Sequence, residues 1–228
     1  MATALRETAE RAAGLEDVRC VIVTGSGTTF AAGADLREVE AASTAENLAY
    51  NAQLRAAVDA VAALPVPSIA AVNGHAIGGG LELALACTLR VAAAEAKLGM
   101  PEARLGIIPA TGGLARLPRL VGSARAAKLL LTGDLVGAEE ARAIGLVDDV
   151  APAAEVLPEA LKLAARIATA APLSTRAIVE TLRADAGLPV AEANLRTEER
   201  LATLLDSADR REGARAFLER RDPDFTGS

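Results

Sequence analysis

Glu82 is the residue of this sequence that most strongly indicates chemistry. It lies in the segment GGGLELALACTL, where nearly every other side chain is apolar or small. A helix that is apolar on all faces is buried. A carboxylate inside such a helix costs on the order of several kcal/mol unless it has a partner or a function. Glu82 is therefore a candidate acid or base, and the alternative is a first-turn cap that bonds to the backbone near Gly79.

Three consecutive glycines precede this glutamate. Gly78, Gly79 and Gly80 allow a backbone to approach a ligand closely, and a helix N-terminus presents free N–H groups and a partial positive charge. Donors directed at one point, with a carboxylate one turn away, form an oxyanion hole beside an acid or base. The alternative is that the glycines only allow tight packing. Neither nucleotide-binding fingerprint is present, because no Lys-Ser/Thr follows and the G-x-G-x-x-G spacing is absent.

A second carboxylate, Glu102, follows Met100 and Pro101 in the sequence MPE. Proline in a first helical turn with an acidic residue beside it is typical of a helix start. The residue pattern alone therefore predicts only that a helix opens here.

Composition limits the classes of function. The chain has 228 residues, of which 51% are hydrophobic, enough for one substantial domain or a domain with a helical appendage. Its 30 acidic and 24 basic side chains give a net charge of −6, which argues against nucleic acid as a partner. Aromatic residues make up 2% and include no tryptophan, which disfavours a platform for base stacking.

Cysteine and histidine usage bears on cofactors and location. Cys20 and Cys87 stand in apolar surroundings and indicate buried thiols in a reducing compartment. With a single histidine, His75, no transition-metal cluster can be assembled by spacing. The first residues contain no apolar signal core. We therefore expect a cytoplasmic protein with no metal, no nucleic acid and no membrane as a partner.

Hydrophobic patterning predicts alternating strands and helices in the first two thirds of the chain. The apolar run 18–24 favours a strand covered on both faces, and the small residues of 30–34 form a loop leading to a helix that Asp35 caps. The remaining predicted strands are 68–72, 89–93, 97–98 and 146–150. The remaining predicted helices are 2–13, 45–63, 80–88, 138–143 and 114–131, the last with breaks at Pro118 and Gly122.

The character of the sequence changes after position 150. Four amphipathic helices with mixed charges are predicted at 153–171, 172–186, 189–206 and 209–221, with no strand pattern among them. We therefore divide the chain into a core that carries the active site, 1–150, and a helical C-terminal region, 151–228. That region is expected to pack on the core or on another subunit.

Several segments together resemble one known family. FAAGADL, PSIAAVNGHAIGGGLELALAC, KLGMPEARLGIIP, GGLARLPRLVG and LTGDLVGAEEARAIGLVDDV follow one another as in the enoyl-CoA hydratase/isomerase family, also called the crotonase family. The resemblance extends from about Val18 to the C-terminus. It implies an α/β fold in which ββα units wind into a spiral. It also implies a helical C-terminal oligomerisation region that forms homotrimers, often paired as homohexamers.

The resemblance also implies a site and a substrate. The substrate is an acyl-CoA, so that coenzyme A enters as part of the substrate and no metal or redox cofactor is expected. The thioester oxygen lies between the backbone N–H groups of Ala34 and Gly79, and Glu82 and Glu102 are the catalytic carboxylates. The matching positions that contact substrate are Ala32, Asp35, Leu36, Arg37 and Gly113.

Isomerases of the family often keep a carboxylate at only one of the two positions of Glu82 and Glu102, so the resemblance favours hydration, and the hypothesis is a short or branched 2-enoyl-CoA as substrate. Addition of water to a double bond conjugated to a thioester places negative charge on the carbonyl oxygen, which two N–H donors stabilise. One carboxylate removes a proton from water and another delivers one to carbon. We assign Glu102 as the proton donor to the α-carbon and Glu82 as the group that orients and deprotonates water.

The chain departs from the family pattern in two places. Family members usually begin with a β-hairpin, whereas this sequence begins at the helix that follows it, so the N-terminal hairpin is missing and activity is in question. Family members also often have G-A-G-G-T-Q-R where this chain has ATGGLAR, from Ala110 to Arg116. The acyl pocket is therefore expected to differ.

Two alternatives to the hydratase hypothesis remain open. One is an isomerase that moves the double bond, or another acyl-CoA enzyme that uses the same oxyanion hole. The other is a non-catalytic acyl-CoA-binding oligomer, disabled by the short N-terminus. Hydration of crotonyl-CoA, conversion of a 3-enoyl-CoA without water addition, and binding without turnover distinguish the three.

Overall fold

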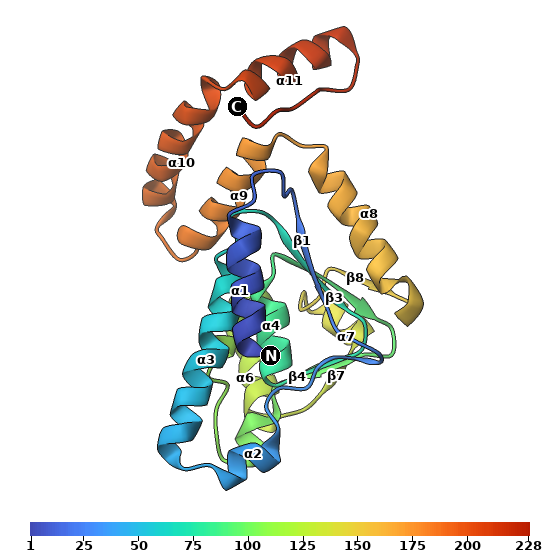
Figure 1. The fold of residues 1–228 in the computed structure, drawn as a ribbon, viewed down its shortest axis with the longest axis vertical. Coiled ribbons are helices and arrows are strands. Elements are labelled where there is room, and N and C mark those ends of the chain that lie inside the picture. The colour runs from blue at the N-terminus through green and yellow to red at the C-terminus, as the bar shows by residue number, and fades with distance from the viewer.

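The computed structural model describes residues 1–228, except for the side chain of Glu38. Two four-stranded sheets are surrounded by helices (Figure 1). The strands are β1 (Val21–Thr24), β2 (Thr29–Ala31), β3 (Ser68–Val72), β4 (His75–Ile77), β5 (Leu89–Ala93), β6 (Lys97–Gly99), β7 (Val136–Gly137) and β8 (Asp149–Ala151). The helices of the first part are α1 (Ala2–Ala13), α2 (Leu36–Ala41), α3 (Thr44–Ala62), α4 (Gly79–Ala86), α5 (Gly113–Val121), α6 (Ser123–Thr132), α7 (Ala138–Ala143) and the 3₁₀ helix η1 (Pro101–Leu105).

The strands alternate between the two sheets, and this alternation defines the spiral. The first sheet has the order β1-β3-β5-β8 and is entirely parallel, and the second has the order β2-β4-β6-β7, with only β7 antiparallel. Each of the first three turns therefore supplies one strand to each sheet before the chain enters a helix. The predicted spiral of ββα units is confirmed.

The centre of the first sheet is the strand β3. All five of its residues are buried, and the helix α8 (Val156–Ala168) packs against it. Short side chains at Ala70 and Ala71 allow this close layering, since both are fully buried. A parallel strand covered on both faces is expected to be an uninterrupted apolar run, and residues 69–72 match that rule.

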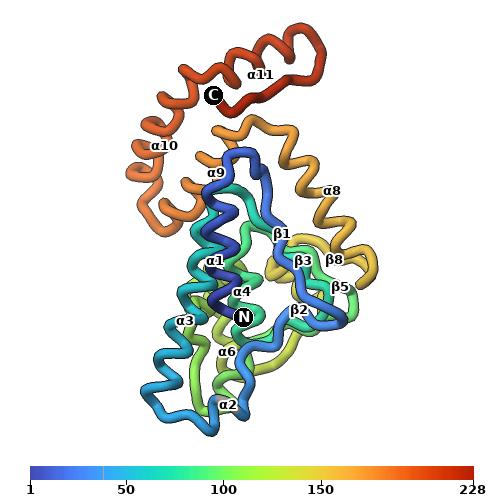
Figure 2. Tube along the Cα trace, in the orientation of Figure 1, coloured from blue at the N-terminus to red at the C-terminus, as the bar shows by residue number. Residues whose placement is uncertain are grey.

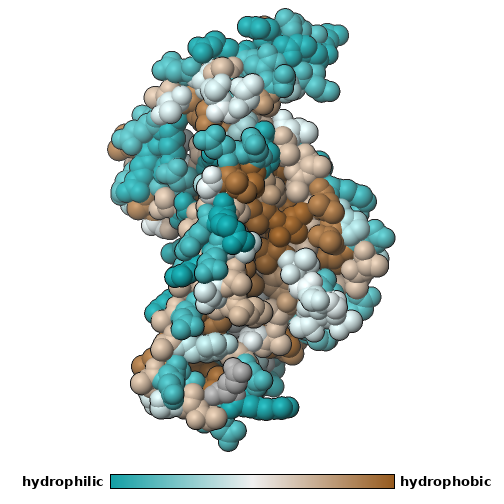
Figure 3. Space-filling view, in the orientation of Figure 1, coloured by the Kyte–Doolittle hydropathy of each residue, from teal (hydrophilic) through white to brown (hydrophobic). Residues whose placement is uncertain are grey.

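Strand β1 is shorter and less covered than the sequence predicts. The run 18–24 forms a strand only at Val21–Thr24, and its apolar residues are half-buried. Of the described strands, β1 pairs with β3 alone and stands at the sheet edge. Figure 3 shows apolar surface over this region. The prediction that this strand is covered on both faces is therefore wrong.

The other differences from the predicted elements are local. Strands β2, β4 and β7 were not predicted, because runs of two or three residues carry no readable periodicity. Strand β8 starts at Asp149 rather than at Leu146, because the N–H groups of Leu146 and Val147 donate to the carbonyl oxygen of Ala141 in α7. Pro118 lies inside α5 without ending it, while Gly122 does separate α5 from α6, with a φ of 82°.

The last third of the chain is helical, as predicted. It comprises a short 3₁₀ helix η2 (Ala153–Glu155), α8, α9 (Pro172–Ala184), α10 (Val190–Leu205) and α11 (Ala208–Glu219). Helix α8 lies on the first sheet, whereas α10 and α11 extend beyond the spiral at one end of the molecule (Figures 1 and 2). At the opposite end of the chain, α1 runs alongside α3.

Candidate active site

The glycine turn between β4 and α4 brings two chain segments into backbone contact. Gly78 is the N-cap of α4 and has a φ of 57°, a conformation that favours glycine. A Cβ atom on Gly80 would lie 2.0 Å from the carbonyl oxygen of Ala31, so the first turn of α4 presses directly on β2. Gly80 thus contacts β2 itself, whereas Gly79 faces Gly33 in the segment after β2.

The two predicted oxyanion donors lie on adjacent backbones. Gly33 has a φ of 82°, and a Cβ atom there would be 3.3 Å from the nitrogen of Gly79. Ala34 directly follows Gly33, so its backbone is next to the part of the chain that meets Gly79. Neither N–H group has a hydrogen-bond partner among the residues that the structure describes. Two free donors beside a helix N-terminus can bind one developing oxyanion.

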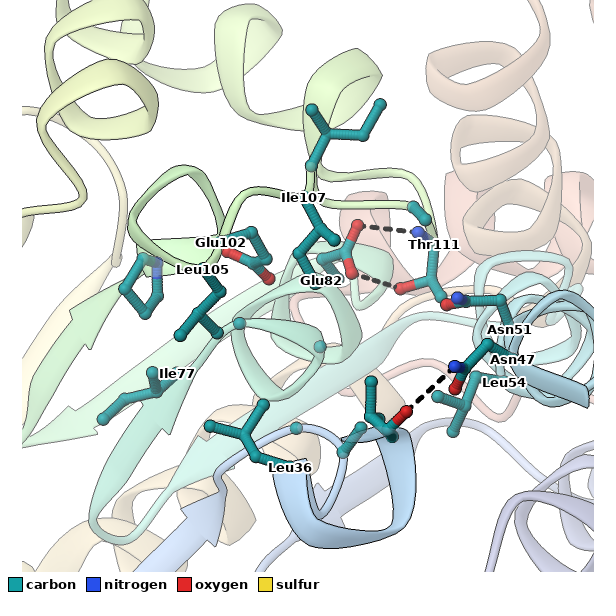
Figure 4. Close-up of a pocket in the computed structure, with 18 of the residues that line it drawn as sticks. Leu36, Asn47, Asn51, Leu54, Ile77, Glu82, Glu102, Leu105, Ile107 and Thr111 are labelled. Atoms are coloured by element: carbon teal, nitrogen blue, oxygen red, sulfur yellow. Dashed lines mark hydrogen bonds between the residues drawn. The ribbon is translucent and has the colours of Figure 1, made fainter. Parts of the chain in front are cut away.

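A cavity of about 620 Å³ opens beside these donors (Figure 4). This volume is within the usual range of small-molecule sites. The predicted site residues that line it are Ala32, Ala34, Leu36, Gly79, Glu82 and Glu102. Apolar side chains from α2, α3, η1 and the loop after η1 form much of the remaining wall, including Val39, Leu54, Leu105, Ile107 and Ile108.

Glu82 points into this cavity and is held by three donors. Its side chain is 2% exposed. Oε1 accepts hydrogen bonds from the backbone N–H groups of Thr111, at 2.8 Å, and Gly113, at 2.7 Å. Oε2 accepts the hydroxyl of Thr111 at 2.6 Å. The carboxylate therefore does not cap α4, and the capping alternative for this residue is wrong.

Glu102 faces the same cavity but has a different environment. The residue is 8% exposed and opens η1, as its Pro-Glu sequence predicts. Within the described part of the chain, its buried Oε2 has no hydrogen-bond partner. A Cβ atom on Gly78 would lie 2.9 Å from its Oε1, so the glycine turn leaves room for this carboxylate. Burial raises the pKa of Glu102 above its ordinary value of 4.5, and the charge of Glu82 raises it further, against the effect of a backbone hydrogen bond.

Three predicted substrate contacts stand outside the lining of the cavity. Asp35 caps α2 by accepting the backbone N–H of Arg37 at 2.9 Å, and both residues are exposed. Gly113 is buried behind Glu82 and acts on the cavity through its N–H group. A Cβ atom at Gly113 would be 2.7 Å from Sδ of Met100 and 3.0 Å from Oε1 of Glu82, so glycine is needed for this close approach.

Several residues of the site were not predicted from the sequence. Thr111 provides two of the three donors to Glu82, and helix α3 contributes Asn47, Tyr50, Asn51 and Leu54 to the cavity. Their i, i+3, i+4, i+7 spacing indicates one helix face, but nothing in that spacing says what the face contacts. Figure 4 shows Asn51 directed towards the region of Thr111.

Neither a metal-binding cluster nor a membrane-spanning helix is found among the described residues. Apart from the undescribed side chain of Glu38, no group of three or more His, Cys, Asp or Glu residues could hold a metal ion. No described helix is long and apolar enough to cross a membrane.

Comparison with known proteins identifies the family. The family model for enoyl-CoA hydratase/isomerase matches residues 1–228. A 2,3-dehydroadipyl-CoA hydratase of Escherichia coli is 42% identical over 220 residues, which are 96% of this chain and 85% of that protein. An enoyl-CoA isomerase/hydratase of Mycosarcoma maydis is 42% identical over 210 residues, which are 92% of this chain and 77% of that protein.

A solved structure has the same fold. An enoyl-CoA hydratase from Bacillus anthracis is 36% identical, has a TM-score of 0.97, and is matched over 100% of this chain and 88% of that one. The spiral fold and these relatives identify an enzyme of the crotonase superfamily. The chain belongs to the enoyl-CoA hydratase/isomerase family, the crotonase family.

Proposed function

We propose that this protein is an enoyl-CoA hydratase, which adds water across the 2,3-double bond of a 2-enoyl-CoA. The observation that carries the proposal is the meeting of two buried carboxylates, Glu82 and Glu102, in one cavity beside two free backbone donors. Hydration requires a base for water, an acid for the α-carbon and stabilisation of an enolate oxygen. The cavity offers a group for each requirement.

The thioester oxygen binds between the N–H groups of Ala34 and Gly79. Attack of water on the β-carbon forms a carbon–oxygen bond and moves the electrons of the double bond towards this oxygen. A single oxyanion donor contributes about 2.7–4 kcal/mol to such a transition state. Because α4 begins at Gly79, its partial positive charge acts in the same direction.

The environments of the two carboxylates support opposite roles. Glu82 is surrounded by three donors, as suits an acceptor-only, ionised carboxylate. It takes a proton from the attacking water. Glu102 has a raised pKa and a buried, unpartnered oxygen, as suits a group that holds a proton. It delivers that proton to the α-carbon, after which proton transfer through solvent restores both groups.

The test is the decay of the conjugated enoyl-thioester absorbance during incubation with crotonyl-CoA. Wild type is compared with Glu102→Gln and Glu82→Gln, each of which keeps the side-chain shape. Loss of one acid or base group is expected to lower kcat by about 10²–10⁴-fold. Wild-type decay that both variants lose supports the proposal.

The same assay separates the alternatives. If the wild type shifts the double bond of a 3-enoyl-CoA but does not hydrate crotonyl-CoA, the protein is an isomerase. Binding of crotonyl-CoA without turnover of either substrate indicates a non-catalytic binding protein. Full activity in Glu102→Gln contradicts the assignment of Glu102 as the proton donor.

A further inference from the structure

The hydroxyl group of Thr111 has a position that the proposed reaction does not by itself explain. It donates to Oε2 of Glu82 at 2.6 Å, while the backbone N–H of the same residue donates to Oε1 at 2.8 Å (Figure 4). One residue thus binds both oxygens of the carboxylate. Thr111 is 3% exposed and Glu82 is 2% exposed, so bulk water does not compete for these bonds.

The hydrogen bonds to Glu82 can be counted against what a carboxylate accepts. An ionised carboxylate has about four lone-pair sites, two on each oxygen. The N–H groups of Thr111 and Gly113 occupy both sites of Oε1. The Thr111 hydroxyl occupies one site of Oε2. One acceptor site therefore remains, and it is on Oε2.

We propose that Thr111 is a positioning residue whose hydroxyl leaves Glu82 a single free acceptor site, where the attacking water binds. This inference rests on the proposed hydratase function. Without the hydroxyl, Oε2 has two open sites, and water can bind in an unproductive place or the carboxylate can turn. With it, the orientation of the water relative to the β-carbon is fixed before the substrate reacts, which lowers the entropic part of the barrier.

The loop that carries Thr111 is itself held in place. Arg116 donates through Nη1 to the carbonyl oxygen of Thr111 at 3.0 Å, and its Nη2 forms an ion pair with Asp59 of α3 at 2.9 Å. Gly112 has a φ of 114°, and a Cβ atom there would be 2.0 Å from Nη1 of Arg116. The Arg116 side chain therefore holds the backbone of Thr111 from one side, while Glu82 binds the residue from the other.

The experiment compares Thr111→Val, which replaces only the hydroxyl by a methyl group, with Thr111→Ser, which keeps the hydroxyl. The matched control is Thr88→Val, because the hydroxyl of Thr88 bonds to Ser68 at the far end of α4. Steady-state hydration of crotonyl-CoA gives kcat and KM, and thermal denaturation verifies that each variant is folded.

For Thr111→Val we expect kcat to fall about 10- to 100-fold with KM unchanged, as for loss of a hydrogen bond to a charged group. Thr111→Ser should stay close to wild type, and Thr88→Val should keep wild-type kcat. The inference is overturned if Thr111→Val has wild-type kcat, if only its KM changes, or if Thr111→Ser is as impaired as Thr111→Val.

A second readout does not depend on activity. Crystal structures of wild type and Thr111→Val should show the Glu82 carboxylate turned, or carrying an additional water on Oε2, in the variant alone. An unchanged carboxylate with unchanged hydration refutes the inference. Absence of hydration by wild type refutes the proposed function instead, and the two crystal structures still decide the role of Thr111.

Discussion

At the scale of single residues, the site consists of two carboxylates made different by their neighbours. Glu82 accepts three hydrogen bonds, whereas Oε2 of Glu102 has no partner among the described residues. In the proposed mechanism the same side-chain type thus acts as the base in one position and as the proton donor in the other. Environment rather than residue type assigns the roles.

The raised pKa of Glu102 has a consequence for stability. In the unfolded chain this group ionises near 4.5, whereas the folded chain keeps the proton to higher pH. The folded state binds more protons in that window, so the free energy of unfolding falls as the pH rises through it. Relative to Glu102→Gln, wild type should therefore lose stability as the pH increases from 4.5, measured by urea denaturation at a series of pH values.

Glu212 provides a control of opposite sign. Hydrogen bonds from Arg221 and the backbone of Asp224 lower the pKa of this carboxyl to about 2. Relative to Glu212→Gln, wild type should lose stability as the pH falls from 4.5 towards about 2. A wild-type curve parallel to that of Glu102→Gln above pH 4.5 would contradict the account of Glu102.

At the scale of secondary-structure elements, the site depends on how closely α4 approaches its neighbours. Gly80 contacts β2 through its backbone, with room for no Cβ atom, since one would lie 2.0 Å from the oxygen of Ala31. At Gly79 a Cβ atom would be 3.6 Å from Cα of Gly33, which is an ordinary contact. Of two adjacent glycines in the same turn, Gly80 is therefore required by packing, whereas Gly79 has room for a side chain.

This difference can be tested by replacing each glycine with alanine, which adds one methyl group at each position. Gly80→Ala should destabilise the protein by about 3 kcal/mol, because overpacking against backbone cannot be relieved by a rotamer change. Gly79→Ala should stay within about 1 kcal/mol of wild type in stability, since the helix accommodates alanine and the space exists. Urea denaturation measures both values, and equal stabilities would show that α4 can shift away from β2.

At the scale of the whole molecule, the last helices expose apolar side chains beyond the spiral. Phe217 is 83% exposed and Leu218 is 82% exposed on α11, and Val190, Leu195 and Leu182 are also exposed on α10 and α9. Exposed apolar surface of this extent indicates an interaction site. We propose that copies of this chain cover it, in a homotrimer or a hexamer of two trimers.

Replacement of Phe217 by aspartate should shift the protein to a smaller assembly, because a charge would be buried at the interface. Sedimentation velocity measures the change. Phe217→Leu keeps the apolar surface and should retain the wild-type assembly. A wild type that sediments as a monomer at all concentrations would contradict the proposal.

The sequence alone determined the order of the longer elements and the candidate carboxylates. The Ala-rich helix α3 and the apolar run of β3 are predicted from local composition, because alanine favours a helix and an uninterrupted apolar run favours a buried strand. Glu82 stands out because burying a charge in an apolar helix is unfavourable unless the charge has a partner or a function. The motif spacing then predicted the family, which the comparisons confirmed.

Only the tertiary structure decided what surrounds each carboxylate. Glu82 and Thr111 are separated by 29 positions, and no local pattern predicts that a loop threonine donates to a helix glutamate. The same holds for α3, whose side chains form a wall of the cavity, and for β1, which stands at a sheet edge. Hydrogen bonding and burial depend on contacts between distant segments, whereas sequence periodicity reports only which face of an element is apolar.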